Sequence, residues 1–190
     1  MIRPVRVAAP VEYPVSILEA ADHCRVTNDL EASQLEGFIA AATAHLDGYA
    51  GILGRCLITQ TWRQDFNDWT DVRLPFTDIK SPSIIWRNAL GVSSPVAGAD
   101  FYVEENHLGA HVRFVSGWSA PSLPMTGSAP VSVTFTAGYG GAEDVPRSIR
   151  QAILLMVGHW YSNREAVTDG ALTAMPLSVD ALITPHRLML

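Results

Sequence analysis

The sequence predicts an α+β fold in which a helical core carries a β-rich insertion. Two observations lead to this fold class: strong helical patterns stand near both ends of the chain, and the apolar residues between them alternate as they do in strands. The core should contain two N-terminal helices and a long C-terminal helix, with the insertion between the second and third helices. We therefore predict a single domain over 1–190, with an extended arm at 1–14, the β-rich insertion at 55–140 and a terminal tail at 178–190.

Helix start signals place the first two helices. Ser16 and Glu19 have the spacing of a capping box, which predicts a short helix that continues to about Cys24. Apolar side chains then recur at three- and four-residue spacing and predict a longer helix over about 29–50, which Gly51 would end. Each of these helices should bury one apolar face.

The third helix is expected over about 146–163, with Pro146 in its first turn. Its apolar residues occupy so much of the circumference that two sides of the helix should be buried. The glycine-rich run 138–141 precedes this helix. Because the run lacks the spacing and the lysine of a phosphate-binding loop, we interpret it as a turn.

The middle of the chain follows the two-residue period of β-strands. In the first strand Ile58, Trp62 and Phe66 fall on one face, and Gln60 and Gln64 share that face. A Ser-, Pro- and Gly-rich loop precedes the clearest strand. The further strands are expected at 72–75, 83–87, 101–103, 111–115 and 131–136, with a hairpin between 101–103 and 111–115 and the loop at 116–130.

Charge and composition argue against several classes of function. The 190 residues carry a formal net charge of −6, and Lys80 is the only lysine. Tight binding of duplex DNA needs many contacts between cations and phosphates, whereas the arginines here stand singly along the chain. Cys24 and Cys56 fit neither a disulfide framework nor a CxxC metal site. With no secretion signal or membrane span evident, we expect a soluble protein made in the cytoplasm.

A metal site is the strongest catalytic candidate, but its pattern favours a polar hairpin. His107 and His111 stand close to Glu104 and Glu105, and zinc takes three or four ligands of these kinds on a fixed frame. Histidines four residues apart converge on one face of a helix, whereas this stretch has the pattern of a hairpin. We therefore predict no metal and no cofactor.

Two further groups of reactive side chains also favour structural roles. His23 lies next to Cys24, but adjacent residues of a helix point to different faces and cannot easily share a proton. Asp65, Asp68 and Asp71 lack the spacing of a calcium-binding loop. We therefore predict no catalytic residues and no enzyme activity.

Four segments stand in a recognisable order along nearly the whole chain. They are PVSILEA leading to CRV at 14–20 and 24–26, the alanine run at 40–42, LITQTW at 57–62, and a C-terminal block with VTFTAGYG at 133–140, the stretch 145–153 and HWYSNREA at 159–166. In this order they resemble the head–tail connector (adaptor) proteins of long-tailed phages and of the related gene transfer agent particles.

The resemblance implies a structural subunit without catalytic residues. About twelve copies would form a ring beneath the portal of a DNA-filled capsid. The ring would join the portal protein to the stopper and tail-side neck proteins, and double-stranded DNA would pass through it without specific binding. Such a subunit would assemble in the bacterial cytoplasm and end in the neck of a phage or gene transfer agent particle.

Two sets of residues are then candidates for contacts with other chains. The apolar tail would dock with the portal, and the apolar stripes of the long helices would pack between subunits. The portal-binding candidates are Leu182, Ile183, Arg187, Leu188 and Leu190, and the inter-subunit candidates are Leu35, Phe38, Leu46, Leu154, Val157 and Tyr161.

Two other classes of function stay open. A metal-dependent hydrolase would use His107 and His111 with the nearby carboxylates. A carbohydrate-binding or adhesive module would use exposed Trp69, Trp86 or Trp118 in and beside the β-rich middle. Stoichiometric zinc or manganese in the purified protein would favour the first class, and glycan binding by a monomer would favour the second.

Overall fold

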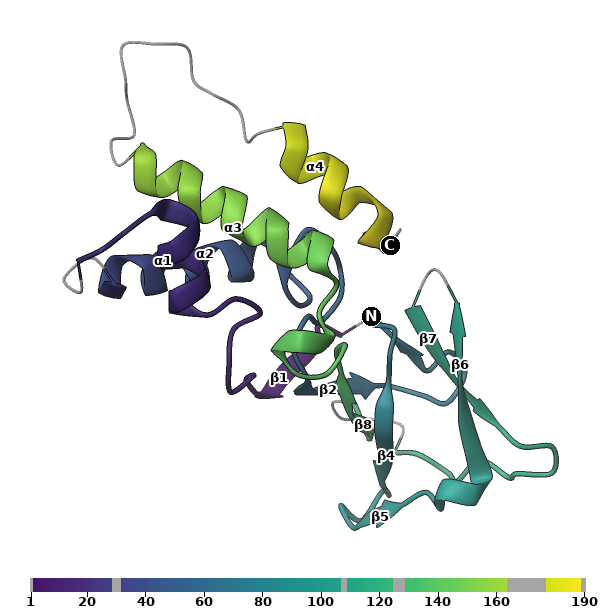
Figure 1. The fold of residues 1–190 in the computed structure, drawn as a ribbon. Coiled ribbons are helices and arrows are strands. Elements are labelled where there is room, and N and C mark those ends of the chain that lie inside the picture. Colours follow the sequence, from purple (N-terminus) through teal and green to yellow (C-terminus); the bar gives the residue numbers. More distant parts are fainter. Residues whose placement is uncertain (1, 29–31, 107–108, 125–128, 164–176, 189–190) are drawn as a thin grey trace. The chain divides into compact units, whose positions relative to one another are not determined.

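The chain folds into two compact units in a computed structural model, which describes residues 2–28, 32–106, 109–124, 129–163 and 177–188 (Figure 1). We call them the helical unit and the β unit. The helical unit comprises Val11–Ile58 and Tyr139–Arg187, and the β unit comprises Met1–Pro10, Thr59–Gly138 and Leu188–Leu190.

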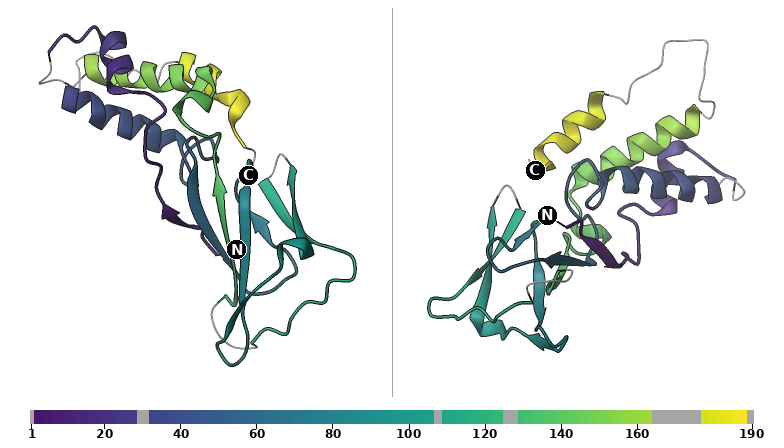
Figure 2. Two further views of the ribbon diagram at one scale, coloured as in Figure 1. Left: turned by 60° about the horizontal axis from the view of Figure 1, so that its bottom comes forward. Right: turned by 180° about the vertical axis from the view of Figure 1, so that it is seen from behind.

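The helical unit is built around α3. Its helices are α1 (Ile17–Cys24), α2 (Ala32–Leu46), α3 (Arg147–Ser162) and α4 (Leu177–Ile183), with short 3₁₀ turns at η3 (Ala142–Asp144) and η4 (Thr184–His186). The helix α3 contacts α1, α2 and α4, and Figures 1 and 2 show these helices around it. The sequence predicts burial on two sides of this helix, and these neighbours cover much of its apolar circumference within the chain itself.

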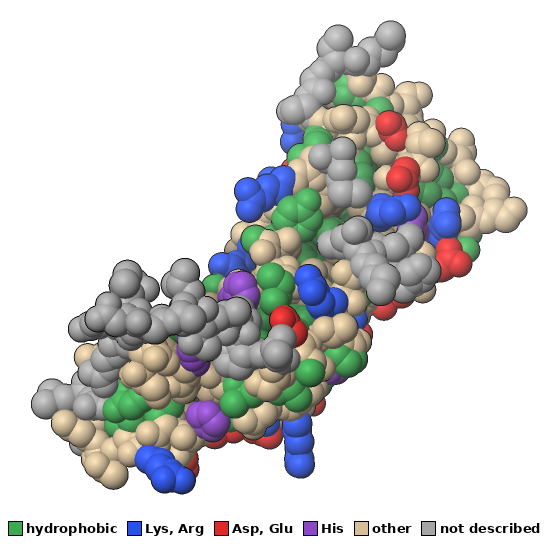
Figure 3. All heavy atoms as spheres, turned by 90° about the horizontal axis from the view of Figure 1, so that it is seen from above, with side chains coloured by type: hydrophobic (Ala, Val, Ile, Leu, Met, Phe, Trp, Pro, Cys, Tyr) green, Lys and Arg blue, Asp and Glu red, His purple; other side chains and the backbone are tan. Residues whose placement is uncertain are grey.

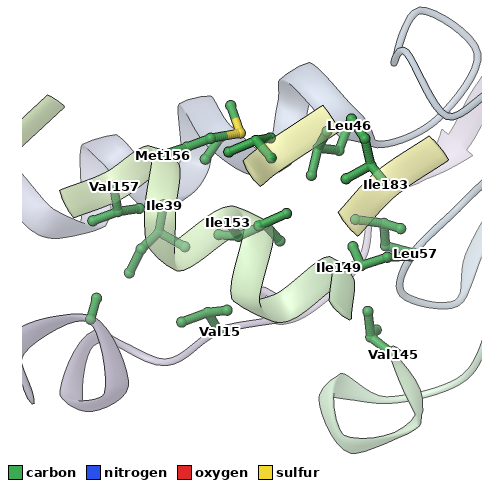
Figure 4. Packing of buried hydrophobic residues seen from close by; sticks show 14 of the residues in the cluster. Val15, Ile39, Leu46, Leu57, Val145, Ile149, Ile153, Met156, Val157 and Ile183 are labelled. Atoms are coloured by element: carbon green, nitrogen blue, oxygen red, sulfur yellow. The ribbon is translucent and has the colours of Figure 1, made fainter. Parts of the chain in front are cut away.

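Aliphatic side chains form the core of the helical unit. Ile149, Ile153 and Met156 of α3 are fully buried, as are Ile39 and Leu46 of α2. Figure 4 shows them pointing into one interior together with Leu57 and Ile183. Burial of this apolar surface is the main term that stabilises the unit.

The predicted start of α1 is confirmed and the predicted end of α2 is not. The backbone amide of Glu19 donates to the Ser16 hydroxyl at 3.2 Å, and the Glu19 carboxylate accepts from the Ser16 amide at 2.8 Å. The helix α2 ends at Leu46, four residues before the expected end near 50. The turn that follows is held by the Asp47 carboxylate, which accepts from the Leu57 amide at 2.7 Å.

The β unit contains two antiparallel sheets. The larger has the order β1-β2-β8-β4-β5 and the smaller has the order β3-β7-β6. The strands of the larger sheet are β1 (Val5–Ala8), β2 (Gln60–Phe66), β8 (Val131–Ala137), β4 (Lys80–Arg87) and β5 (Ser93–Pro95). Those of the smaller sheet are β3 (Arg73–Leu74), β7 (Gly109–Phe114) and β6 (Phe101–Asn106), which the 3₁₀ turn η2 (Gly98–Asp100) precedes.

Aromatic rings form much of the core of the β unit. The predicted alternation of β2 is confirmed, because Gln60, Trp62, Gln64 and Phe66 are all buried on one face. Phe76 contacts Trp62 at 5.0 Å between ring centroids and Phe135 at 6.2 Å. The predicted hairpin is also confirmed, since β6 and β7 pair from Phe101 and Phe114 to Asn106 and Gly109.

The predicted fold class is wrong in two respects. The described part of the chain has four helices, and the last of them, α4, has seven residues, so the helical core does not end in a long C-terminal helix. The β part is also more than an insertion between the second and third helices, because β1 pairs with β2 through Val5 and Arg63. The prolines of the arm exclude a helix there, but four of the five residues between Pro4 and Pro10 form the strand β1.

No helix in the described part of the chain is both long and apolar enough to cross a membrane.

Candidate assembly interface

The C-terminal segment packs onto its own subunit. Val179 and Ile183 of α4 are fully buried in the core of the helical unit. Beyond α4, the hydroxyl of Ser148 and Nε2 of His186 lie 2.7 Å apart, and Nε of Arg187 donates to the Ile52 carbonyl at 3.3 Å. The segment therefore belongs to the fold of the subunit.

The predicted portal-binding residues differ in how far they are available to a partner. Ile183 is 0% exposed and Leu182 and Leu188 are half-buried, whereas Arg187 is exposed. Leu190 lies outside the described residues. A partner could therefore contact Leu182, Arg187 and Leu188 without unfolding α4, but it could not contact Ile183.

His186 stands in a half-buried and positively charged environment. Burial lowers the pKa of its imidazole below 6.5, and the nearby Arg55 guanidinium lowers it further. Because the neutral ring is favoured, the contact with Ser148 is made by an uncharged imidazole at neutral pH. Protonation of this ring would disfavour its place beside Ser148 and Arg55, so we expect acid to weaken this contact.

Arg150 joins three segments at the other side of α3. Its guanidinium binds the Glu19 carboxylate of α1 and, at 3.1 Å, the Glu143 carboxylate of η3. The Ala142 amide donates to the Glu12 carboxylate at 3.0 Å. The Ser16 amide and the Arg150 guanidinium lower the pKa of Glu19, so its carboxylate stays charged in the capping box. These bonds fix the entry into α1 against α3.

The predicted inter-subunit residues fall into two groups. Leu35, Leu46 and Val157 are fully buried and belong to the core of the subunit itself. Phe38, Leu154 and Tyr161 are half-buried at the edge of that core, where a neighbour could reach them. Their packing between subunits stays a prediction.

The metal candidates make separate contacts. Glu104 pairs with Nε of Arg113 at 2.9 Å, and Glu105 accepts from the amides of Asp78 and Ile79 at 3.0 and 2.7 Å. Buried His111 lies 3.6 Å from the Asp71 carboxylate. His107 is outside the described residues, and within them no three His, Cys, Asp or Glu side chains gather around a point where a metal ion could bind.

His23 and Cys24, which the sequence analysis assigns to structural roles, have different surroundings in the structure. Cys24 is half-buried, and burial raises the pKa of its thiol, which disfavours the reactive thiolate. The imidazole of His23 points toward Gly158 of α3, where a Cβ would lie 3.2 Å from its Nε2. Its ring thus covers a glycine of the neighbouring helix.

The tryptophans considered for sugar binding are divided between two places. Trp69, Phe114 and Trp118 contact one another, with Phe114 and Trp118 stacked at 3.9 Å between ring centroids. Nε1 of Trp69 donates to the Pro121 carbonyl at 3.1 Å. Trp86 lies elsewhere, beside a hollow on the larger sheet. The stacked faces of Phe114 and Trp118 are occupied by each other and are not free for a sugar ring.

Large apolar side chains are exposed in both units, at positions that the sequence analysis did not single out. In the helical unit Val11 is 99% exposed and Leu18 is 78% exposed, and Tyr13 and Ile17 lie partly exposed between them. In the β unit Ile2, Val5 and Ile85 are exposed along the larger sheet. The clue in the sequence is that these residues lie off the periodic stripes. Tyr13 with Ile17, and Ile2 with Ile85, each line a common hollow, and exposed apolar surface of this kind is suited to contacts with other proteins.

Charged side chains are dispersed over the surface. On the face drawn in Figure 3, Lys and Arg side chains stand singly or in small groups between acidic, polar and hydrophobic ones. That face has no basic stripe among its described residues, which agrees with the dispersed arginines of the sequence. It therefore lacks the electrostatic pattern of tight DNA binding.

The fold places the chain among structural components of virus-like particles. Neither a protein-family model nor a curated protein matches it, but solved structures with the same fold come from the virions and necks of gene transfer agent particles.

Three such chains resemble this one along nearly their whole lengths. A chain from the neck of an empty gene transfer agent particle, solved with C6 symmetry, is 27% identical with a TM-score of 0.78. A chain from the neck of the native particle, solved with C12 symmetry, is 25% identical with a TM-score of 0.71. A chain from the native virion is 26% identical with a TM-score of 0.77. Each comparison covers 100% of this chain and 97% of the other.

Proposed function

We propose that this protein is a structural subunit of the neck of a gene transfer agent or related phage-like particle, and that it acts as the head–tail adaptor. Copies of the chain form a ring beneath the portal. The ring joins the portal to the stopper and tail-side proteins and leaves a central passage for double-stranded DNA.

The full-length likeness to neck chains carries this proposal. The likeness covers 100% of this chain at TM-scores of 0.71 to 0.78, so both units match, not one shared motif. The neck structures were solved with C6 and C12 symmetry. Identical copies related by rotation form a closed ring when each presents two complementary surfaces, and this chain exposes apolar clusters in both units.

The electrostatic character of the chain agrees with a passage for DNA. The net charge is −6, and the face drawn in Figure 3 has no basic stripe among its described residues, so that face attracts few phosphates. DNA could slide through such a ring without being held. The DNA contact would therefore be non-specific and weak.

Contact with the portal is assigned to the exposed side of the C-terminal segment. Leu182, Arg187 and Leu188 keep accessible surface while Val179 and Ile183 hold α4 to the core. Deletion of all residues after Ser178 would remove both buried anchors and damage the subunit. Substitution of Leu188 by Asp leaves these anchors in place and is the cleaner test.

The test of the function is assembly with its neighbours. The chain is expressed together with the portal and neck proteins encoded beside it. The mass of the complexes is then measured, and they are imaged by electron microscopy. The expected result is a symmetric ring of this chain attached to the portal. A protein that stays monomeric and unattached in the presence of those partners would contradict the proposal.

The portal contact is tested in the same system. Leu188→Asp should reduce the amount of this chain that purifies with the portal by about tenfold, because an ionised side chain is costly to bury in an apolar contact. Ala41→Asp adds the same charge to an exposed position of α2 and serves as the control. Equal attachment of both variants would move the portal contact away from the C-terminal segment.

A further inference from the structure

The charge of the chain is divided unequally between its units. The helical unit has six Lys and Arg against twelve Asp and Glu, whereas the β unit has seven against seven. The whole net charge of −6 therefore belongs to the helical unit. Electrostatic attraction between two copies of the chain needs a cationic part of one to meet an acidic part of the other.

The cationic part is the solvent face of the larger sheet. Residues that pair across neighbouring strands point to the same side, and the register aligns Arg63 with Thr134 and Lys80 with Thr136. Arg87 is exposed at the end of β4, and its guanidinium has no ionic partner among the described residues. The carboxylate on this face, Asp65, is already bound by Nε of Arg63 at 3.2 Å.

This sheet face also has apolar surface and a hollow. Arg63, Arg87, Ile2 and Ile85 line a recess of about 330 Å³. Ile2 is 37% exposed and Ile85 is 46% exposed. A surface that combines cations with exposed isoleucines suits an acidic protein better than it suits a phosphate backbone, which offers isoleucine nothing to bury against. We call this recess the sheet recess.

A surface of opposite charge lies on the helical unit. Glu12, Glu36, Tyr13 and Ile17 line a hollow of about 460 Å³, together with the two carboxylates that bind Arg150. The hollow holds four carboxylates against the one guanidinium of Arg150. Glu36 is exposed on α2, and no bond to its carboxylate is found in the described part of the chain. We call this hollow the acidic recess.

We propose that the sheet recess of one subunit binds the acidic recess of its neighbour in the ring. The proposal rests on the ring of the proposed function. The two recesses belong to different units and have opposite charges, and each exposes apolar side chains at its edge. Two different surfaces on one chain make a heterologous contact, and repetition of such a contact around an axis closes a ring. The charges select the pairing and its register, and the apolar side chains supply buried surface.

Arg87 and Glu36 are the residues through which the contact can be tested, because both are exposed and neither side chain has an ionic partner among the residues that the structure describes. In rings formed with the co-expressed portal, Arg87→Glu alone and Glu36→Arg alone each place like charges at every contact. Each should lower the yield of closed rings by about tenfold. The double variant Arg87→Glu with Glu36→Arg restores opposite charges and should restore the yield.

A mixture of the two single variants separates contacts between subunits from contacts within one. When Arg87→Glu and Glu36→Arg chains alternate, every contact again joins opposite charges. The mixture should therefore form rings of even copy number, as the C6 and C12 symmetries of the similar necks allow. Arg147→Glu and Asp22→Arg change the charge equally at exposed positions outside both recesses and should leave the ring unchanged.

Several outcomes would overturn the proposal. Rings of Arg87→Glu at the parental yield would remove the sheet recess from the interface. Failure of the mixture to assemble, with both variants folded by circular dichroism, would show that the two residues do not meet between subunits. If Arg87→Glu left rings intact but lowered DNA retention, the face would belong to DNA. If the parental chain formed no ring, the proposed function would be contradicted, and the contact between the two recesses, which depends on the ring, would be contradicted as well.

Discussion

The helical unit and the β unit fill their hydrophobic cores with different kinds of side chain. Aliphatic residues such as Ile149 and Ile153 fill the helical core, whereas the rings of Trp62, Phe76 and Phe135 fill much of the β core. The helical unit also carries the whole net charge, and the β unit is balanced. Because each unit has an interior of its own, substitutions in one should leave the other folded.

The largest expected effect is the loss of a ring from the β core. Phe76 is fully buried and contacts Trp62 and Phe135, so Phe76→Ala should lower the free energy of unfolding of the β unit by about 3–5 kcal/mol. Hydrogen exchange followed by mass spectrometry should show faster exchange in β2 and β8 and unchanged exchange in α3. Equal acceleration in both units would mean that they unfold as one.

A slightly smaller effect is expected where α4 joins the helical core. Ile183→Ala removes a fully buried side chain and should cost about 2–5 kcal/mol in the unfolding of the helical unit. Leu182→Ala is the matched control, because the Leu182 side chain is only half-buried and its loss should cost less. A larger loss from Leu182→Ala in denaturant titrations would contradict the assigned orientation of α4.

The attachment of the C-terminal segment should weaken in acid. The pKa of His186 lies below 6.5 in the folded protein because burial and the Arg55 charge disfavour the imidazolium. A lowered pKa means that the detached segment binds protons more readily, so the contribution of His186 to attachment is fully present above pH 6.5 and should be lost as the pH falls through the folded pKa. The ring protons of His186, followed by NMR, should titrate below those of exposed histidines, and the η4 signals should shift with them.

His186→Gln removes the titrating group and should abolish this part of the pH dependence. A His186 titration at or above the midpoint of the exposed histidines would contradict the environment described.

The smallest effect is a gain of stability in the helical unit. Gly37 lies on the exposed side of α2, and a Cβ added there meets no atom within 4 Å. Gly37→Ala should therefore stabilise this unit by about 0.5–1 kcal/mol, because alanine loses less backbone entropy in a helix. Ala41→Gly at an exposed position of the same helix should cost a similar amount. The two midpoints in thermal unfolding should move in opposite directions.

Local patterns predicted much of the fold because they report interactions between near neighbours. The capping box of Ser16 and Glu19, the buried face of β2 and the hairpin of β6 and β7 all follow from residues close in sequence. The separate roles of Glu104 and Glu105 also agree with the hairpin that the sequence indicates. For the capping box, the face of β2 and the hairpin, the spacing of the side chains and the geometry of the backbone allow only one local structure.

Contacts between distant segments were not predictable in the same way. The sequence of the arm shows that it is not helical, but its residues do not indicate that Val5 pairs with a residue of β2. The wide apolar surface of α3 indicates that other residues pack over it, but not whether they belong to the same chain or to another. In the structure, α4 of the same chain covers part of this surface. For the same reason Leu35, Leu46 and Val157 resemble interface residues in sequence, although they are fully buried within the subunit.

The two outer strands of the larger sheet are short and flanked or interrupted by proline. Pro4 and Pro10 bracket β1, and Pro95 lies within β5. Proline cannot donate a main-chain hydrogen bond, so these edges are poor templates for another strand. The sheet is thereby protected at both edges against pairing with strands of other copies, which is the contact that starts fibrillar aggregation.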